Sequence, residues 1–414
     1  MKVLWFTNTP ASGEEYLKTN VVRGGWLKSL DKALKEKVDL HVAFYYPKYA
    51  APFEYKGIHY YPICKFNWKR QILKKLIFGD YVDQEDLPTY LSIIENVHPD
   101  IIHIHGSENP FGCMIGKTLI PIVLSIQGNQ TVYLHKYFSG IEKKYLTGRQ
   151  FRISDIKATI FDRSFKQEYC LSKKTQLREV RNLKNCLNII GRTDWDRRVS
   201  RILAPDSLYY HNDEVLRNCF YNSVWEKPKN DHIIIHSTIG VNFFKGLETL
   251  SEALYELNLL GLNVEWRVAG ISQTNQIITV VKRKLGKKYP STGLIFLGNL
   301  NEEDLVARLL EADTYVMPSH IENSPNNLCE AMIIGMPCIA TFAGGTGSLL
   351  KDREDGILIQ AGDPWSMAGA ILELNKNQII AQKYSINARK NAIYRHDKER
   401  IVNDLVNIYT SIIG

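Results

Sequence analysis

Short apolar segments alternate with longer amphipathic segments along almost the whole chain, and this alternation restricts the fold more than any other feature. The apolar segments are four to seven residues long and rich in Val and Ile, which is typical of strands buried on both faces of a parallel sheet. Strand–helix alternation of this kind predicts βαβ units in doubly wound sheets. In the first half we expect strands at 3–7, 40–46, 58–61, 101–105, 122–127 and 187–190, with helices at 22–34 and 87–97.

The alternation is interrupted once, at the polar, Pro-containing segment 225–231, and then begins again. At 414 residues the chain is long for a single core. We therefore predict an α/β protein of two doubly wound domains, 1–224 and 232–395. The last residues, 388–413, carry apolar side chains at helical spacing. The second half has predicted strands at 233–236, 264–268, 294–297 and 314–317, with helices at 247–259 and 303–312.

Composition points to an ordinary globular protein, with 44% hydrophobic and 23% charged residues. The seven cysteines are scattered without a C-x-x-C pair, so we expect free thiols in a reducing cytoplasm and neither a disulfide framework nor a zinc site. We expect no signal peptide at the start and no membrane-spanning segment.

The positive charge is concentrated in the first half. Residues 1–220 hold 33 Lys and Arg against 23 Asp and Glu, whereas residues 221–414 have a slight acidic excess. Such asymmetry predicts that the first half faces something anionic. Segment 66–78 mixes basic and aromatic residues at helical spacing, and it fits a helix lying on a membrane surface. An ordinary amphipathic helix with a solvated basic face fits equally, and no motif supports nucleic-acid binding.

The richest segment for function runs from Glu322 to Met332. It places two carboxylates, Glu322 and Glu330, eight positions apart across a turn that leads into a predicted helix at 328–334. Glu330 lies in the first turn of that helix, where free backbone amides can hold an anion. A carboxylate beside an anion site suits a ligand that also carries hydroxyl groups, and a sugar nucleotide offers both.

A second candidate anion contact is Lys245-Gly246, which opens the predicted helix 247–259. A cation beside free helix amides suits a diphosphate, although a solvated lysine at a helix start is the simpler interpretation.

These residues carry a family resemblance. Glu322 and Glu330, with the surrounding Pro318-Ser319, Gly335-Met336-Pro337 and Gly344-Gly345, resemble the E-x7-E pattern of retaining GT-B glycosyltransferases of family 4. The resemblance is specific in the second half and loose in the first. It implies two Rossmann-like domains facing across a cleft, with a C-terminal helix at 396–414 that crosses back to the first domain.

In such a family the second domain holds the nucleotide sugar. The resemblance implies that Glu330 contacts the ribose, that Glu322 lies near the transferred sugar, and that Lys245 grips the donor phosphates. The base would meet the backbone of the loop after strand 294–297. The other implied donor contacts are Gly298, Leu300, Asn326, Asn327, Leu328, Gly24 and Gly25.

The chain departs from the family pattern before Lys245, where an Arg is common and Ile239 and Gly240 stand here. The second phosphate contact is then lost, replaced by Asn242, or supplied by Arg192 from the first domain. These three alternatives stay open.

The first domain would bind the acceptor. His103 and His105 share a strand face, so we expect His103 in the core and His105 at the cleft, where it is a candidate catalytic residue. Gln127 stands where many family members have His. Retaining transfer by front-side attack does not require a base there, because the leaving phosphate can take the acceptor's proton. The predicted acceptor contacts are Gln127, Gly128, Ser107 and Glu108.

Two other enzyme classes fit less well. Asp194-x-Asp196 matches the metal-binding D-x-D of GT-A glycosyltransferases, but that fold has one nucleotide domain, and this chain has two predicted domains and E-x7-E. Asp194 and Asp196 could instead line the cleft or form a structural ion-pair cluster. A dehydrogenase would need a glycine motif after the first strand, and residues 8–13 do not supply one.

We therefore predict a retaining, metal-independent glycosyltransferase that uses no cofactor. Its donor would be a nucleotide sugar, most simply UDP-linked, and its acceptor a saccharide on a lipid carrier at the inner face of a bacterial membrane. The resemblance places it in surface polysaccharide synthesis, of the capsule or exopolysaccharide type. The alternatives are a nucleotide-sugar epimerase of similar layout and a non-enzymatic basic protein that binds a membrane surface.

Overall fold

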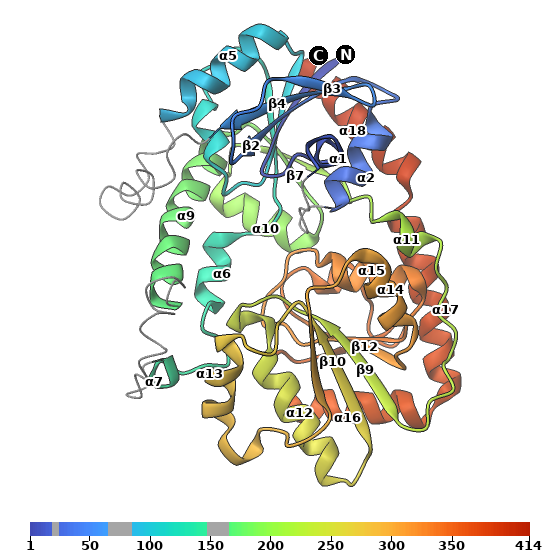
Figure 1. The fold of residues 1–414 in the computed structure, drawn as a ribbon. Helices are drawn as coiled ribbons and strands as arrows, with labels where there is room; N and C mark the ends of the chain where they lie inside the picture. The colour runs from blue at the N-terminus through green and yellow to red at the C-terminus, as the bar shows by residue number, and fades with distance from the viewer. Residues whose placement is uncertain (19–24, 65–84, 147–164) are drawn as a thin grey trace. The chain divides into compact units, whose positions relative to one another are not determined.

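Two parallel sheets organise the chain, each with helices on both faces (Figure 1). The computed structural model describes residues 1–18, 25–64, 85–146 and 165–414. Residue contacts divide it into two units. Unit 1 comprises 1–131, 171–215 and 396–414, and unit 2 comprises 132–170 and 216–395.

Unit 1 contains an eight-stranded sheet of order β3-β4-β2-β1-β5-β6-β7-β8, parallel except for β3, which pairs antiparallel with β4. The β3–β4 hairpin was not predicted, because its first strand has only three residues. The strands are β1 (Lys2–Thr7), β2 (Asp39–Tyr46), β3 (Phe53–Tyr55), β4 (Ile58–Cys64), β5 (Ile101–His105), β6 (Ile122–Ser125), β7 (Asn188–Gly191) and β8 (Leu208–His211).

Two apolar cores cover the faces of this sheet. One lies under α2 (Gly25–Leu34) and α18 (Lys398–Ile413), and the other under α5 (Leu87–Val97). The remaining helices of unit 1 are α1 (Gly13–Leu17), a 3₁₀ turn (Pro110–Met114) and α10 (Asp194–Leu203). Helices α6 (Gln130–Lys136), α7 (Lys143–Leu146) and α9 (Phe165–Asn185) complete the first half of the chain.

Unit 2 repeats the design with a six-stranded, fully parallel sheet of order β11-β10-β9-β12-β13-β14. One core lies under α12 and α16, and the other under α14, α15 and α17. The strands are β9 (Ile233–Thr238), β10 (Val264–Ala269), β11 (Leu294–Gly298), β12 (Thr314–Met317), β13 (Cys338–Thr341) and β14 (Ile357–Ile359). The helices are α11 (Asn218–Tyr221), α12 (Leu247–Leu259), α13 (Gln276–Leu285), α14 (Glu302–Leu310), α15 (Asn326–Ile334), α16 (Pro364–Lys376) and α17 (Gln378–Arg395), with 3₁₀ turns at Phe243–Lys245, Gly286–Lys288 and Thr346–Ser348.

The C-terminal segment is two helices where a continuous apolar period suggested one. The chain breaks between α17 and α18 at Asp397, whose side chain accepts a hydrogen bond from the Arg400 amide and caps α18. Helix α18 buries one apolar face in unit 1, and there its Tyr409 hydroxyl meets Trp5 Nε1 at 3.1 Å and His103 Nδ1 at 2.6 Å. The predicted fold class, two doubly wound α/β units with a C-terminal helix on the first, is confirmed.

None of the described helices is long and apolar enough to cross a lipid bilayer.

A buried acid on α2 gives unit 1 a pH-dependent stability. Asp31 is fully buried and accepts hydrogen bonds from the Ser12 amide and hydroxyl, both at 2.7 Å, and from Tyr60 at 3.2 Å. Burial outweighs these bonds and raises the pKa of Asp31 to about 6.

Since an unfolded Asp titrates near pH ~3.9, the unfolded chain ionises first as pH rises, so the stability of the folded state falls between about pH 4 and pH 6 and stays lower above pH 6. We expect this group to cost the folded state on the order of 3 kcal/mol across that window, at about 1.4 kcal/mol per pKa unit. Asp31→Asn should remove that part of the pH dependence. Unfolding of wild type and variant in denaturant at pH 4 and pH 6 measures it, and parallel curves for the two proteins would contradict the assignment.

Candidate active site

The E-x7-E residues lie at the carboxyl edge of the unit 2 sheet, where doubly wound sheets bind their ligands. Strands β9, β12 and β13 are neighbours, and the segments that follow them meet at this edge. Glu322 lies in the segment between β12 and α15, and Lys245 in the 3₁₀ turn between β9 and α12. The sheet topology therefore brings together residues 77 positions apart in sequence.

Glu322 is held by two donors. Lys245 Nζ lies 2.6 Å from Glu322 Oε1, and the Ser319 hydroxyl donates to the same oxygen at 2.7 Å. The Glu322 side chain is 5% exposed, whereas that of Lys245 is 23% exposed. The lysine thus neutralises a buried carboxylate while part of its own side chain stays exposed.

The backbone around Glu322 permits no side chain at Gly344. The Gly345 amide donates to the Glu322 carbonyl at 2.9 Å, and Gly344 has φ +58°. A Cβ atom built on Gly344 would overlap that carbonyl oxygen. The glycine-rich loop after β13 is therefore what allows the Glu322 segment to lie against the sheet edge.

Helix α15 begins at this edge with the asparagine pair, which the sequence pattern placed in a loop before the helix. Pro325 is the N-cap residue and makes no side-chain capping bond. Asn327 Nδ2 donates to the Thr238 carbonyl at the end of β9, and Asn327 Oδ1 accepts from the Leu328 amide at 3.1 Å. The first turn of α15, with Asn326, is thereby fixed beside β9, with its partial positive charge at the sheet edge.

Glu330 is paired with an arginine that sequence reasoning did not select. Arg217 Nε and Nη2 donate to the two carboxylate oxygens of Glu330, both at 2.8 Å, in a bidentate pair. The Glu330 side chain is 8% exposed and that of Arg217 is 22% exposed. Arg217 precedes α11, just before the segment taken as the linker, so no motif pointed to it.

Gly298 ends β11, and two backbone hydrogen bonds fix its position. Gly298 has φ +68°, accepts from the Gly270 amide at 2.7 Å and donates to the Ile271 carbonyl at 3.0 Å. Leu300 is partly buried against the core. Both remain predicted donor contacts.

The structure offers no arginine at the positions before Lys245. Ile239 is buried in the core, and Gly240 is exposed. Asn242 precedes the 3₁₀ turn, and its carbonyl accepts from the Lys245 amide at 3.0 Å. Asn242 therefore shapes the turn that carries Lys245.

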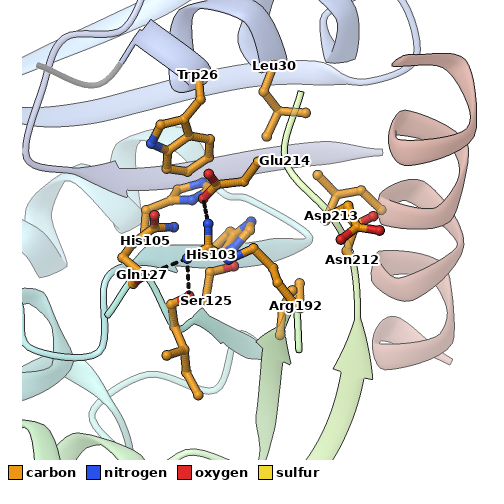
Figure 2. Close-up of a pocket in the computed structure, with 13 residues that line it drawn as sticks. Trp26, Leu30, His103, His105, Ser125, Gln127, Arg192, Asn212, Asp213 and Glu214 are labelled. Atoms are coloured by element: carbon orange, nitrogen blue, oxygen red, sulfur yellow. Dashed lines mark hydrogen bonds and ion pairs between the residues drawn. The ribbon is translucent and has the colours of Figure 1, made fainter. Parts of the chain in front are cut away.

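In unit 1, a small pocket opens at the carboxyl ends of β5, β6 and β7 (Figure 2). Trp26, His105 and Gln127 lie on one side of it, and Asn212 and Asp213 on the other. His103 was predicted to lie in the core. It is 1% exposed and bonds Tyr409 and Ser125, both at 2.6 Å.

His105 lies at the pocket and is 4% exposed. Neither of its ring nitrogens has a hydrogen-bond partner within the described part of the chain. Burial lowers the pKa of His105 to about 3, so the ring is neutral near pH 7. It can donate or accept one hydrogen bond but carries no charge, and its catalytic role remains a prediction.

Arg192 is deeply buried at the same pocket. It pairs with Glu214 at 2.5 Å and donates to the backbone carbonyls of Gln127 at 2.6 Å and Ile126 at 3.3 Å. These contacts tie the ends of β6 and β7 together. A phosphate bound by Arg192 would have to share the guanidinium group with Glu214 and the two backbone carbonyls.

The acceptor candidates Ser107 and Glu108 follow β5, and Gln127 and Gly128 follow β6. The Ser107 hydroxyl donates to Glu179 at 2.8 Å and lies 3.5 Å from the Gly128 carbonyl. Burial raises the pKa of Glu108 to about 7, with the nearby Glu179 adding to the shift. A carboxyl group that is half protonated near pH 7 can donate a hydrogen bond to a hydroxyl oxygen or accept one.

Glu179 was missed because it lies in the long helix α9, far from any motif. Its carboxylate accepts from the amides of Gln130 and Thr131 at 3.1 and 2.7 Å and so caps α6. Of the predicted glycine pair, Gly25 begins α2. Gly24 and segment 66–78 lie outside the described residues.

Asp196 has a structural role. It accepts from the Arg192 amide at 2.9 Å and the Tyr209 hydroxyl at 2.5 Å, and it completes a capping box with Thr193 at the start of α10. Within the described residues, one group has metal-ligand geometry: Asp39, His41 and His59, at the amino ends of β2 and β4, away from the pocket. None of these three residues belongs to the predicted donor or acceptor site.

Comparison with known proteins agrees with this geometry. Residues 222–391 match the family model for glycosyl transferases group 1. This range covers almost all of unit 2 after Arg217 and contains Lys245, Glu322 and Glu330. Residues 222–391 therefore belong to the group 1 glycosyltransferases. The predicted family is confirmed for this group 1 domain.

Curated relatives match over shorter segments. The chain is 29% identical over 118 residues to phosphatidyl-myo-inositol mannosyltransferase of Mycobacterium leprae, covering 28% of this chain and 31% of the relative. It is 27% identical over 139 residues to the putative colanic acid biosynthesis glycosyltransferase WcaL of Salmonella typhimurium, covering 32% and 33%. The matches thus span about a third of each relative's length.

Solved structures match over the full length. Sucrose-phosphate synthase from Thermosynechococcus elongatus superposes with a TM-score of 0.73 at 14% identity, covering 99% of this chain and 98% of that one. Anabaena HepE in complex with UDP and glucose superposes with a TM-score of 0.67 at 14% identity, covering 99% and 100%. At such identity the likeness establishes the fold alone, two Rossmann-like α/β units of the GT-B class.

The close approach at Gly344 leads to a first test. Gly344→Ala should destabilise the group 1 domain by on the order of 2–4 kcal/mol, because it adds a left-handed backbone penalty to an overlap with the Glu322 carbonyl. Gly261→Ala is the matched control, since Gly261 has φ +73° with open space around it, and should cost about 1 kcal/mol. Denaturant unfolding measures both. Equal losses for the two variants would contradict the described contact.

The Arg217–Glu330 pair leads to a second test. Arg217→Ala should cost about 2–3 kcal/mol of stability, somewhat below the range for fully buried pairs because the arginine is partly exposed. Arg217→Ala/Glu330→Ala should cost less than the two single changes added together, because it leaves no buried charge unpaired. Arg308→Ala, which breaks an exposed pair with Glu311, should cost less than about 1 kcal/mol. Strict additivity in a double-mutant cycle would show that the pair is not coupled.

Proposed function

We propose that the chain is a retaining glycosyltransferase that moves a sugar from a UDP-linked donor to a saccharide acceptor. The observation that carries the proposal is the paired arrangement at the start of α15. Two buried carboxylates, Glu322 and Glu330, lie at the sheet edge beside a helix N-terminus, and each has its own cation, Lys245 and Arg217. The donors named for related structures, such as UDP and glucose in HepE, support a uridine nucleotide.

The charges suit a ligand that is anionic at one end and rich in hydroxyl groups at the other. Because each carboxylate is neutralised, the site does not repel a diphosphate as two free acids would. Glu330 keeps lone pairs beyond its two bonds to Arg217 and can accept from ribose hydroxyls. Lys245 and the first turn of α15, with Asn326, Asn327 and Leu328, would hold the phosphates.

In the mechanism we propose, the bond between the anomeric carbon and the diphosphate oxygen breaks as the acceptor oxygen attacks from the same face. Lys245 and the α15 amides stabilise the charge that develops on the departing diphosphate. That diphosphate takes the proton of the acceptor hydroxyl, so the transfer needs no separate base. Glu322 would orient the sugar, and its ionic bond to Lys245 would hold both groups in place before the donor arrives.

The acceptor would bind unit 1. The pocket of Figure 2 offers the neutral His105, and Gln127 and Gly128 lie at the end of β6. Ser107 and Glu108 complete the proposed set. The relatives that act in colanic acid synthesis or on a phosphatidyl-inositol support an acceptor carried on a lipid, in bacterial surface polysaccharide synthesis, at the cytoplasmic face of the membrane. The proposed domain limits are 1–224, 232–395 and 396–414.

The first experiment is calorimetric binding of UDP, GDP and ADP without metal. We expect UDP to bind most tightly, and Glu330→Ala to weaken it by at least tenfold because the ribose contact is lost. Glu303→Ala, an exposed acid on α14, is the matched control and should leave binding unchanged. A folded protein that binds none of the three nucleotides would overturn the proposal.

Turnover separates the enzyme classes. A transferase should release UDP from a UDP-sugar only when a saccharide acceptor is present, whereas an epimerase would convert the donor alone. Lys245→Ala should abolish the release of UDP in the presence of the acceptor. Conversion of the donor without an acceptor would favour the epimerase.

A further inference from the structure

Helix α17 of unit 2 exposes a regular apolar stripe that its own domain does not cover. Ile379, Ile386 and Ile393 are seven residues apart, about two helical turns, and are 84%, 58% and 45% exposed. Tyr394, next to the last of them, is 72% exposed. The stripe extends about 20 Å along the helix, at about 1.5 Å per residue.

The opposite face of α17 explains why the stripe faces outward. Ala381, Tyr384, Ser385, Ala388 and Ala392 are buried. The Ser385 hydroxyl donates to the Gly335 carbonyl at the end of α15 at 2.5 Å. Small residues thus bring α17 close to α15, and the larger isoleucines point away from the domain. An ordinary surface helix has the reverse arrangement.

Basic residues follow the same stripe. Lys383 and Lys390 of α17 are exposed and seven residues apart, exposed Lys376 lies just before them at the end of α16, and the 18 residues of α17 contain no Asp or Glu. Beside the stripe, Lys383 and Lys227 line a shallow groove together with Ile379 and Ile386. Two acids lie beside this helix: the Glu354 carbonyl accepts from Asn387 at 2.7 Å while its side chain pairs with Lys351, and Asp355 Oδ2 accepts from Asn391 Nδ2 at 2.7 Å.

We propose that the outward face of α17 is a docking surface for an anionic lipid bilayer. Isoleucines would enter the boundary between headgroups and acyl chains, and the flanking lysines would reach anionic headgroups. A second copy of this chain fits less well, because a two-fold pairing of the stripe would place like-charged lysine rows side by side. The inference goes beyond the proposed function, since it concerns a face of unit 2 that contains none of the donor residues.

The test is co-flotation of the full chain with vesicles of phosphatidylcholine containing 30% phosphatidylglycerol, and with vesicles of phosphatidylcholine alone. We expect binding to the anionic vesicles, at least tenfold weaker binding to the neutral ones, and weakening by salt. Lys383→Glu/Lys390→Glu should reduce the binding constant at least tenfold, because each basic residue near an anionic surface contributes a severalfold factor. Ile379→Ser/Ile386→Ser/Ile393→Ser should reduce it as much.

Matched controls carry the same changes elsewhere. Leu119 and Ile202 of unit 1 are 103% and 81% exposed, and Lys37 and Lys117 are exposed lysines outside α17. Leu119→Ser/Ile202→Ser and Lys37→Glu/Lys117→Glu should keep binding within twofold of wild type. UDP binding by the α17 variants shows that they are folded and separates this test from that of the donor site.

Three results would overturn the proposal. The first is that the wild-type chain does not float with anionic vesicles. The second is that the α17 variants float as well as wild type, which would place any membrane contact on another surface. The third is that light scattering detects a dimer of the wild-type chain that is lost in the isoleucine variants, which would make the stripe an interface between copies.

Discussion

The candidate site depends on the close approach of two loops at the carboxyl edge of the unit 2 sheet. Gly344 lies against the Glu322 carbonyl with no room for a side chain, and the Gly345 amide bonds that carbonyl. A similar restriction holds at Gly246, with φ +77°, where a Cβ atom would overlap the Pro318 carbonyl. The two glycines set the backbone positions of Glu322 and Lys245. The ion pair between Glu322 and Lys245 is a consequence of that backbone packing and not its cause.

Ion pairs hold the side chains at this edge of the unit 2 sheet, as the two glycines hold its backbone. A buried carboxylate without a partner carries a large desolvation cost. Lys245 and Arg217 offset that cost. Lys245 comes from the turn after β9 and Arg217 from the segment between β8 and α11. The site is therefore organised before any ligand binds, which reduces the cost of ordering it during binding.

How far the sequence predicts the molecule depends on whether the decisive contacts are local. The strand–helix alternation, the E-x7-E pair and Lys245-Gly246 are local patterns, and the fold class and the family of the second half followed from them. The short strands β3, β8 and β14 lie at the edges of their sheets, where a strand does not need a continuous buried apolar run, and they were missed. The C-terminal helix that the family resemblance implied at 396–414 is close to α18, whereas the apolar segment read from 388 to 413 crosses the break at Asp397.

The partners of the site residues could not be predicted, because they come from distant segments without motifs. Arg217 lies 113 positions from Glu330, and Glu179 lies 72 positions from Ser107. Arg192 was selected from the sequence as a phosphate contact, which stays a prediction, and its bonds to Glu214 and to the Gln127 carbonyl appear only when β6 and β7 are placed side by side. Sequence patterns identify which residues carry chemistry, and the topology decides what neutralises them.

The central claim is that the start of α15 binds a nucleotide through Glu330 and Lys245. The most direct measurement is a crystal structure of the chain with UDP. We predict ribose hydroxyls within hydrogen-bond distance of Glu330, with the Arg217 pair intact, and the diphosphate at Lys245 and the first turn of α15. A nucleotide bound elsewhere, or one whose ribose makes no contact with Glu330, would contradict the account.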